Sequence, residues 1–258
     1  MSEPLLSVEG VSKSYARGAR PALAAASFQL ARSEILGVVG ESGSGKTTLA
    51  RCVALLERPD AGRVIFKGED LTALSDAELR KRRRGIQTVF QDPYASLNPT
   101  KRIGDALAEV MLVHGLATRD TVRGQVAGLL DQVGLPAVAA DAYPKSFSGG
   151  QRQRICIARA LAAQPDVLIA DEPVSSLDVS VQAQVINLIL DLKDRLGLAV
   201  IFIGHDLQLI DFIAPRVLVM LQGEVVESLA GRSLTEATHD YTRALVKAVP
   251  TLEHLAST

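Results

Sequence analysis

The chain has 258 residues, 47% of them hydrophobic and 22% charged, which suits one large globular domain and excludes collagen-like and intrinsically disordered chains. Its 28 basic and 29 acidic residues give a formal net charge of −1, so no general field favours an anionic membrane, and no nucleic-acid partner is expected. The longest apolar runs, such as residues 196–204, are far below the roughly 18 residues of a membrane span, and the first residues do not resemble a secretion signal. We therefore expect a cytoplasmic protein.

The N-terminal region predicts an antiparallel β edge. Residues 5–15 and 26–30 have strand character and are separated by a polar loop at residues 17–20. Tyr15 ends the first strand, where its ring could stack on a nucleotide base. On these grounds alone, a half-buried strand tyrosine is an equally good interpretation.

A glycine-rich loop comes next, between an apolar run at residues 35–39, typical of a buried parallel strand, and helical spacing at residues 48–56. Its sequence GESGSGKT fits the phosphate-binding pattern G-x-x-x-x-G-K-[ST] at every fixed position. The loop consists of Gly40, Glu41, Ser42, Gly43, Ser44, Gly45, Lys46 and Thr47. Its backbone N–H groups would cradle the α- and β-phosphates of a nucleotide, Lys46 would reach the β- and γ-phosphates, and the Thr47 hydroxyl would ligate Mg²⁺. Because both flanks are right, a chance match is the weaker explanation.

The segment up to residue 84 predicts a turn at residues 59–62, one exposed strand at residues 63–70 and a charged helix. Ser75 can cap this helix with Glu78 three residues later. The helix ends in five basic residues, 80–84, which suit nucleic acid or acidic lipid. Because the overall charge is balanced, a solvated helix face is the better explanation.

Residues 85–90 predict a second buried strand that ends at Gln91. In an open α/β sheet, ligands bind at this carboxyl end of the strands. The amide oxygen of Gln91 could reach Mg²⁺ or the attacking water. The alternative is an ordinary turn residue.

Residues 92–165 lack strand signals and predict an inserted helical subdomain, with helices near residues 104–114, 121–133 and 153–163. The last helix follows Ser148, Gly149, Gly150 and Gln151. A hydroxyl and exposed N–H groups at a helix N-terminus suit an anion, which hints that this second anion site serves another subunit's nucleotide. A simple N-cap explains the geometry equally well.

The strand predicted at residues 167–172 is apolar until it ends in Asp171 and Glu172. Such an ending fits the Mg²⁺-organising strand of P-loop NTPases, with Asp171 holding the metal and Glu172 polarising the attacking water. Asp178 then begins a loop-to-helix transition as a cap. A strand at residues 198–203 presents His205 at the sheet edge expected for Gln91 and Asp171, where it could hydrogen-bond a γ-phosphate.

The C-terminal region predicts a hairpin, residues 216–221 and 224–227, and a closing helix at residues 235–249.

This constellation resembles the ATP-binding subunit of ABC transporters over nearly the whole chain. The resemblance implies that Tyr15 stacks on the base and that residues 40–48, including Thr48, form the Walker A loop. It implies a Q-loop glutamine at Gln91 and a family signature at Ser148, Gly149, Gly150 and Gln151. It also implies Walker B residues Asp171 and Glu172, a D-loop aspartate at Asp178 and a switch histidine at His205. Two cassettes of this family pair head to tail, so Ser148 would contact the γ-phosphate bound by the partner. ATP and Mg²⁺ are the implied cofactors.

Residues 90–99 and 239–245 look more narrowly like the dipeptide, oligopeptide and nickel importer ATPases. Three residues depart from the family pattern: Phe147 replaces leucine, Gly204 replaces Ser or Thr, and Asp240 replaces proline. No cysteine follows Cys156, so we expect no iron–sulfur cluster.

The resemblance implies an α/β P-loop NTPase fold forming a single nucleotide-binding domain, residues 1–258. Residues 1–91 and 166–258 would form the core with its β edge, and residues 92–165 the helical subdomain. The expected function is ATP hydrolysis that drives an importer of peptides or a related small solute. The implied partners are a second ATPase subunit, permease subunits and, indirectly, an extracytoplasmic solute-binding protein. Association with the permease subunits would put the chain on the inner face of the cell membrane. The alternative is a soluble ABC ATPase within a cytosolic enzyme assembly.

Overall fold

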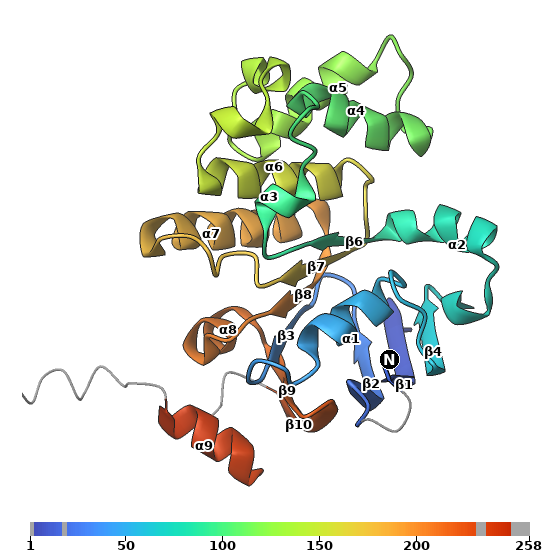
Figure 1. The fold of residues 1–258 in the computed structure, drawn as a ribbon, viewed down its shortest axis with the longest axis vertical. Helices are drawn as coiled ribbons and strands as arrows, with labels where there is room; N and C mark the ends of the chain where they lie inside the picture. Colours follow the sequence, from blue (N-terminus) through green and yellow to red (C-terminus); the bar gives the residue numbers. More distant parts are fainter. Residues whose placement is uncertain (1–2, 17–19, 231–235, 249–258) are drawn as a thin grey trace, which may run out of the picture. The chain divides into compact units, whose positions relative to one another are not determined.

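The computed structural model describes residues 3–16, 20–230 and 236–248 (Figure 1). It consists of two compact units. Unit 1 combines Met1–Thr72 with Ile201–Thr258, and unit 2 is Ala73–Val200. The division falls within strand β8 (Ala199–Ile203). The predicted separation of residues 92–165 as a helical subdomain remains a prediction.

An antiparallel sheet in unit 1 has the order β2-β1-β4-β5. Strand β1 (Leu6–Lys13) pairs with β2 (Leu23–Leu30) and with β4 (Ala61–Phe66), and β4 pairs with β5 (Glu69–Asp70). The predicted antiparallel edge is therefore confirmed. The prediction of one strand over residues 63–70 is wrong, because the chain reverses at Lys67 and Gly68, whose φ angles of 52° and 79° are incompatible with a continuous strand.

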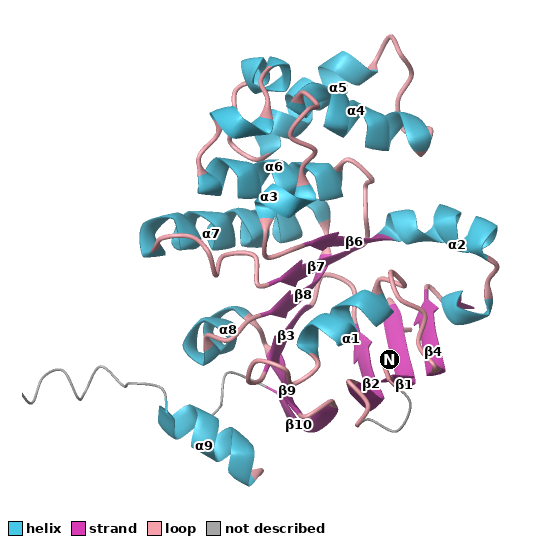
Figure 2. Cartoon of the chain, viewed as in Figure 1, coloured by secondary structure: helices cyan, strands magenta, loops and turns pink. Residues whose placement is uncertain are grey.

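Unit 1 also contains strands of a second sheet (Figure 2). The fully buried strand β3 (Ile35–Val39) lies parallel to β9 (Arg216–Leu221), which forms the predicted hairpin with β10 (Glu224–Ala230). The helices of unit 1 are α1 (Lys46–Val53), α8 (Leu207–Ile213) and α9 (Asp240–Ala248). A Cβ on Gly37 would lie 2.4 Å from Ile210 Cγ2, so this glycine allows α8 to pack directly on β3.

Unit 2 contains the parallel pair β6 (Ile86–Val89) and β7 (Val167–Asp171), both followed by short loops. Its helices are α2 (Asp76–Arg82), α3 (Pro93–Ser96), α4 (Ile103–Val113), α5 (Val122–Gln132), α6 (Gly149–Leu161) and α7 (Val179–Leu196). Helices α4, α5 and α6 pack against one another at one end of this unit (Figure 1). The predicted mixture of parallel strands, antiparallel edge and helices is confirmed.

The helix starts depend on specific side chains. Ser75 and Glu78 form the predicted capping box of α2. Helix α6 begins at Gly149, four residues before the start predicted from apolar spacing, because Ser148 caps it and the first turn carries no apolar stripe. The predicted closing helix begins at Asp240, and residues 235 and 249 of that prediction lie outside the described residues. Of the helices in the described ranges, none is long and apolar enough to cross a membrane.

Candidate functional site

Three glycines shape the loop between β3 and α1. Gly40, Gly43 and Gly45 have φ angles of 153°, 80° and 103°. A Cβ on Gly40 would lie 2.2 Å from the Met220 carbonyl oxygen, and one on Gly45 would lie 2.4 Å from that of Ala22. The loop therefore passes so close to neighbouring backbone that only glycine fits at these two positions.

The loop ends at a helix start suited to an anion. Lys46, the first residue of α1, is 6% exposed, and its Nζ donates to the carbonyl oxygens of Gly40 at 2.8 Å and Glu41 at 2.9 Å. Within the described residues, no side chain caps α1, and its first turn has no acidic residue. The buried Ser44 hydroxyl has no hydrogen-bond partner in that part of the chain. Backbone N–H groups, a lysine and a hydroxyl thus gather where a phosphate would bind.

Tyr15 lies beside this helix. Its hydroxyl is 3.4 Å from Thr48 Oγ1 and donates a hydrogen bond to Glu57. Strand β1 ends at Lys13 rather than at Tyr15, and the Tyr15 side chain is 60% exposed. The structure thus brings the tyrosine and the P-loop helix together in unit 1, with much of the ring open to solvent. Base stacking remains a prediction.

His205 also belongs to unit 1. The preceding residue extends the pairing of β8, since Gly204 N donates to Val38 O at 3.1 Å. The following residue, Asp206, caps α8 by accepting from Leu209 N at 3.1 Å. His205 is thus an exposed residue in a short loop that is hydrogen-bonded on both sides.

The predicted carboxylate pair lies at the end of β7 in unit 2. Asp171 is the last strand residue and is 5% exposed. Glu172 leaves the strand with φ 47°, and its carbonyl accepts from Ser175 N at 3.4 Å and Ser175 Oγ at 3.2 Å. A positive φ is uncommon for glutamate and costs of the order of 1–3 kcal/mol, so the turn that holds Glu172 is locally strained.

Gln91 follows β6 as an exposed residue. Its segment is attached to α6, because Gln153 Nε2 donates to Phe90 O at 3.5 Å and the Arg159 guanidinium donates to Ser96 O. The Arg152 guanidinium lies 3.9 Å from the centre of the Tyr94 ring. Arg152, Gln153 and Arg159 were not among the residues predicted for the site. The signal that could have identified them is their polar character within the apolar pattern of the helix.

Ser148 forms a complete capping box at the start of α6. Its Oγ accepts from Gln151 N at 3.3 Å, and Gln151 Oε1 accepts from Ser148 N at 3.0 Å. The N-cap alternative is therefore correct for the single chain. The exposed hydroxyl keeps its own hydrogen, so it can still donate to an anion.

The two glycines after Ser148 allow close packing within unit 2. A Cβ on Gly149 would lie 3.2 Å from Leu177 Cδ2, and one on Gly150 would lie 2.3 Å from Val181 Cγ1. Asp178 caps α7 as predicted, accepting from Val181 N at 3.1 Å and Ser180 Oγ at 2.9 Å, and these two bonds lower the pKa of its carboxyl group. The structure thus brings the start of α6 and the Asp178 loop together. That residues of both units, such as Lys46 and Asp171, act in one site remains a prediction.

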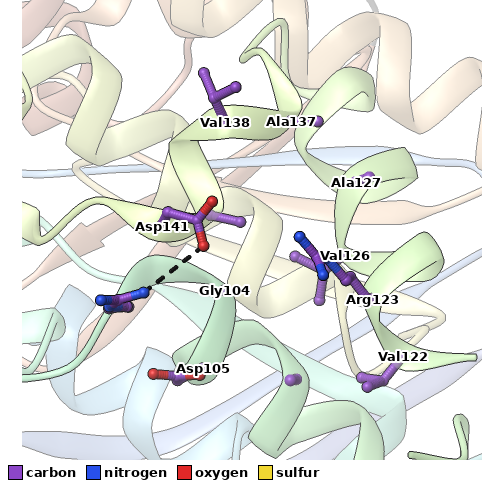
Figure 3. Close-up of a pocket in the computed structure, with 12 residues that line it drawn as sticks. Gly104, Asp105, Val122, Arg123, Val126, Ala127, Ala137, Val138 and Asp141 are labelled. Carbon is purple, nitrogen blue, oxygen red and sulfur yellow. Dashed lines mark ion pairs between the residues drawn. The ribbon is translucent and has the colours of Figure 1, made fainter. Parts of the chain in front are cut away.

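A separate pocket of about 500 Å³ lies in unit 2 among α4, α5 and the 3₁₀ turn Ala137–Asp141 (Figure 3). Its charged residues include Asp105, Arg123 and an ion pair between Arg102 and Asp141 at 3.8 Å. None of the predicted site residues lines it.

Comparison with known proteins identifies the family. The model of the ABC transporter family matches residues 23–175. A Brucella ovis protein assigned as a peptide import ATP-binding protein is 48% identical over 250 residues, and the dipeptide transport ATP-binding protein DppF of Haemophilus influenzae is 46% identical over 258. Each alignment covers 96% of this chain and 79% of the relative.

A solved structure shares the fold. The dimeric ATP-binding cassette MJ0796, in a post-hydrolysis state bound to ADP and Pi, superposes with a TM-score of 0.78 at 29% identity, covering 87% of this chain and 98% of that one. Three observations support the same family assignment: the glycine-rich loop with its buried lysine, the match to the family model and the structural likeness to this cassette. The chain therefore belongs to the ABC transporter family, as an ATP-binding and ATP-hydrolysing cassette.

Proposed function

We propose that this ATPase powers an importer of peptides or a related small solute. The observation that carries the proposal is a complete phosphate-binding loop, with Lys46 buried at its end, in a chain 48% identical to a peptide import ATP-binding protein. The identity extends over 96% of the chain, well beyond the nucleotide-binding motifs. That extent supports a shared role as well as a shared fold.

Nucleotide binding falls to unit 1. The Tyr15 ring stacks on the base, a contact that tolerates any base. The backbone N–H groups of Gly43 and Gly45 receive the phosphates, which approach the N-terminus of α1. Lys46, already oriented by two carbonyl oxygens, supplies a positive charge to the β- and γ-phosphates.

The residues assigned to Mg²⁺ fit that ion. Thr47, Asp171 and Gln91 offer hydroxyl, carboxylate and amide oxygens, which are the hard donors that Mg²⁺ prefers. Within the described residues, no cluster of three or more acidic, histidine or cysteine side chains forms a dedicated metal cage. This agrees with an ion held by one carboxylate, water and the nucleotide's own phosphates, where its charge would offset that of the β- and γ-phosphates.

Hydrolysis uses Gln91 again, together with two further side chains. Glu172 polarises the attacking water as general base, Gln91 orients that water, and His205 donates a hydrogen bond to the γ-phosphate. A second cassette completes each site, with the partner's Ser148, Gly149, Gly150 and Gln151 facing the γ-phosphate and the partner's Asp178 nearby. The dimeric state of the cassette MJ0796 supports this arrangement.

We further propose that the cassette dimer associates with permease subunits at the inner face of the cell membrane and, through them, with an extracytoplasmic solute-binding protein. Closure of the dimer on ATP would drive the permease subunits, and hydrolysis would reset them.

Co-purification tests the importer proposal. The tagged chain, expressed in its native cells, is expected to purify with permease subunits from detergent-solubilised membranes. Peptide-loaded binding protein should then stimulate ATP hydrolysis in liposomes. Association only with soluble enzymes would contradict the importer role and favour the alternative of a cytosolic assembly. The Lys46→Ala variant is the control, because it should assemble without hydrolysing ATP.

A further inference from the structure

Helix α9, at the red end of the colour scale in Figure 1, is bonded to the phosphate-binding loop. The hydroxyl of Tyr241, in the first turn of α9, accepts a hydrogen bond from the backbone N–H of Glu41 at 3.0 Å. The two residues are 200 positions apart in the sequence and belong to the same unit. Glu41 is the second residue of the GESGSGKT loop. The C-terminal helix therefore touches the loop that receives the phosphates.

The peptide group between Gly40 and Glu41 is held from both sides. Its carbonyl oxygen, which belongs to Gly40, accepts from Lys46 Nζ at 2.8 Å, while its N–H, which belongs to Glu41, donates to Tyr241. A peptide group that donates through its N–H becomes a stronger acceptor through its carbonyl oxygen, because hydrogen bonds in a chain polarise one another. Tyr241 thus fixes and polarises the group that orients the lysine.

The start of α9 is itself fixed by Glu227 on β10. Glu227 Oε1 accepts from Thr238 N and Thr238 Oγ1, both at 2.7 Å, and from His239 N at 3.2 Å. His239 Nδ1 accepts from Tyr241 N at 3.2 Å, and the neighbouring Thr242 is fully buried. The tyrosine is therefore held in place by contacts of its own segment with Glu227 of strand β10.

The protonation states of Glu227 and Tyr241 suit the hydrogen bonds that these two residues make. Burial raises the pKa of Glu227, but the polar groups around its carboxylate, Thr242, Thr238 and the N–H groups of Thr238 and His239, outweigh it and lower the pKa from 4.5 to about 2. Burial also raises the pKa of Tyr241, which keeps its hydroxyl protonated at neutral pH.

We propose that Tyr241 is a positioning residue for nucleotide binding, which orients Lys46 through the Gly40–Glu41 peptide group. In this role it acts through Lys46 and not by its own contact with the nucleotide. The inference rests on the proposed function, since it requires Lys46 to contact the phosphates. It assigns to the C-terminal helix a part in holding the P-loop ready for ATP.

The Tyr241→Phe variant tests this role, because it removes one oxygen atom and keeps the ring. We expect the Kd and the KM for Mg-ATP to rise about two- to tenfold, the effect of one hydrogen bond, with kcat at saturating ATP within about twofold. Without nucleotide, deuterium exchange at the Glu41 amide should become faster, which reports the bond directly. The matched control is Tyr143→Phe in unit 2, which should change none of these values.

Unchanged Kd and unchanged exchange at Glu41 would overturn the inference, as would a fall in kcat without a change in KM. An equal loss of affinity in the Tyr143→Phe control would overturn it too, because the effect would then be unspecific. If the unsubstituted protein fails to bind Mg-ATP, the proposed function falls, and the inference with it. If that protein binds Mg-ATP and the Tyr241→Phe variant binds equally well, only the inference falls.

Discussion

Glu172 combines a strained backbone with a carboxylate at the end of a buried strand. Its φ of 47° costs free energy that a turn with glycine at this position would avoid. The adjacent Asp171 is buried, whereas Glu172 is half-buried and therefore accessible to water. Strain retained at a carboxylate beside Asp171, the aspartate predicted to bind Mg²⁺, favours a role in chemistry, and motif spacing alone could not reveal it.

We expect Glu172→Gln to bind ATP normally, to accumulate as an ATP-bound dimer and to lose at least about a hundredfold in turnover, the contribution of a general base. Nucleotide titration, size-exclusion chromatography and phosphate release measure the three effects. Glu109→Gln, an exposed substitution on α4, is the control and should leave all three unchanged. Turnover within threefold of the unsubstituted protein would remove Glu172 from the role of base.

At the scale of elements, helix α6 organises unit 2. It contacts α3, α4, α5, α7 and β6, and its side chains bond the segment that follows β6. Its N-terminus is held by the Ser148 cap and by the close approach of Gly150 to Val181 on α7. The predicted signature therefore has a structural role in the single chain as well as the role proposed for it in the dimer.

The Gly150→Ala substitution tests the structural role. The added Cβ would lie 2.3 Å from Val181 Cγ1, so we expect a loss of about 1–3 kcal/mol in the free energy of unfolding, the usual effect of overpacking. Gly124→Ala is the matched control, because a Cβ there has open space in α5 and should stabilise by up to about 1 kcal/mol. Urea unfolding measures both. A loss of stability in the control, or none at position 150, would contradict this account of the packing.

At the scale of the whole molecule, the described residues include the phosphate-binding loop before α1 and a second helix start suited to phosphate, that of α6. Helix α1 in unit 1 follows that loop, and α6 in unit 2 begins at Gly149, directly after its N-cap Ser148. A head-to-tail dimer would use both, since each nucleotide would lie between the loop of one chain and the Ser148 turn of the other. The cassette MJ0796, which shares the fold, is dimeric.

We expect Ser148→Arg to leave the ATP affinity of the monomer nearly unchanged while preventing dimerisation of the Glu172→Gln protein. Ser148→Ala is the matched variant. Like Ser148→Arg it loses the capping bond, which is worth about 0.5–2 kcal/mol of stability. Because alanine adds neither bulk nor charge, it should weaken the dimer less than arginine does. Sedimentation with and without ATP distinguishes the two. Loss of nucleotide binding by the monomer would contradict the assignment of Ser148 to the partner's site.

The sequence by itself determined what depends on neighbouring residues: the GESGSGKT loop, the strand before Gln91, the strand that ends at Asp171, the caps at Ser75 and Asp178, and the family. Such motifs are legible because their chemistry depends on short spacing and on helix or strand periodicity. The tertiary structure alone decided the reversal at Lys67 and Gly68, the strained φ of Glu172 and the demand for glycine at position 150. It also decided the bond between Tyr241 and Glu41, because contacts 200 residues apart depend on how whole elements pack.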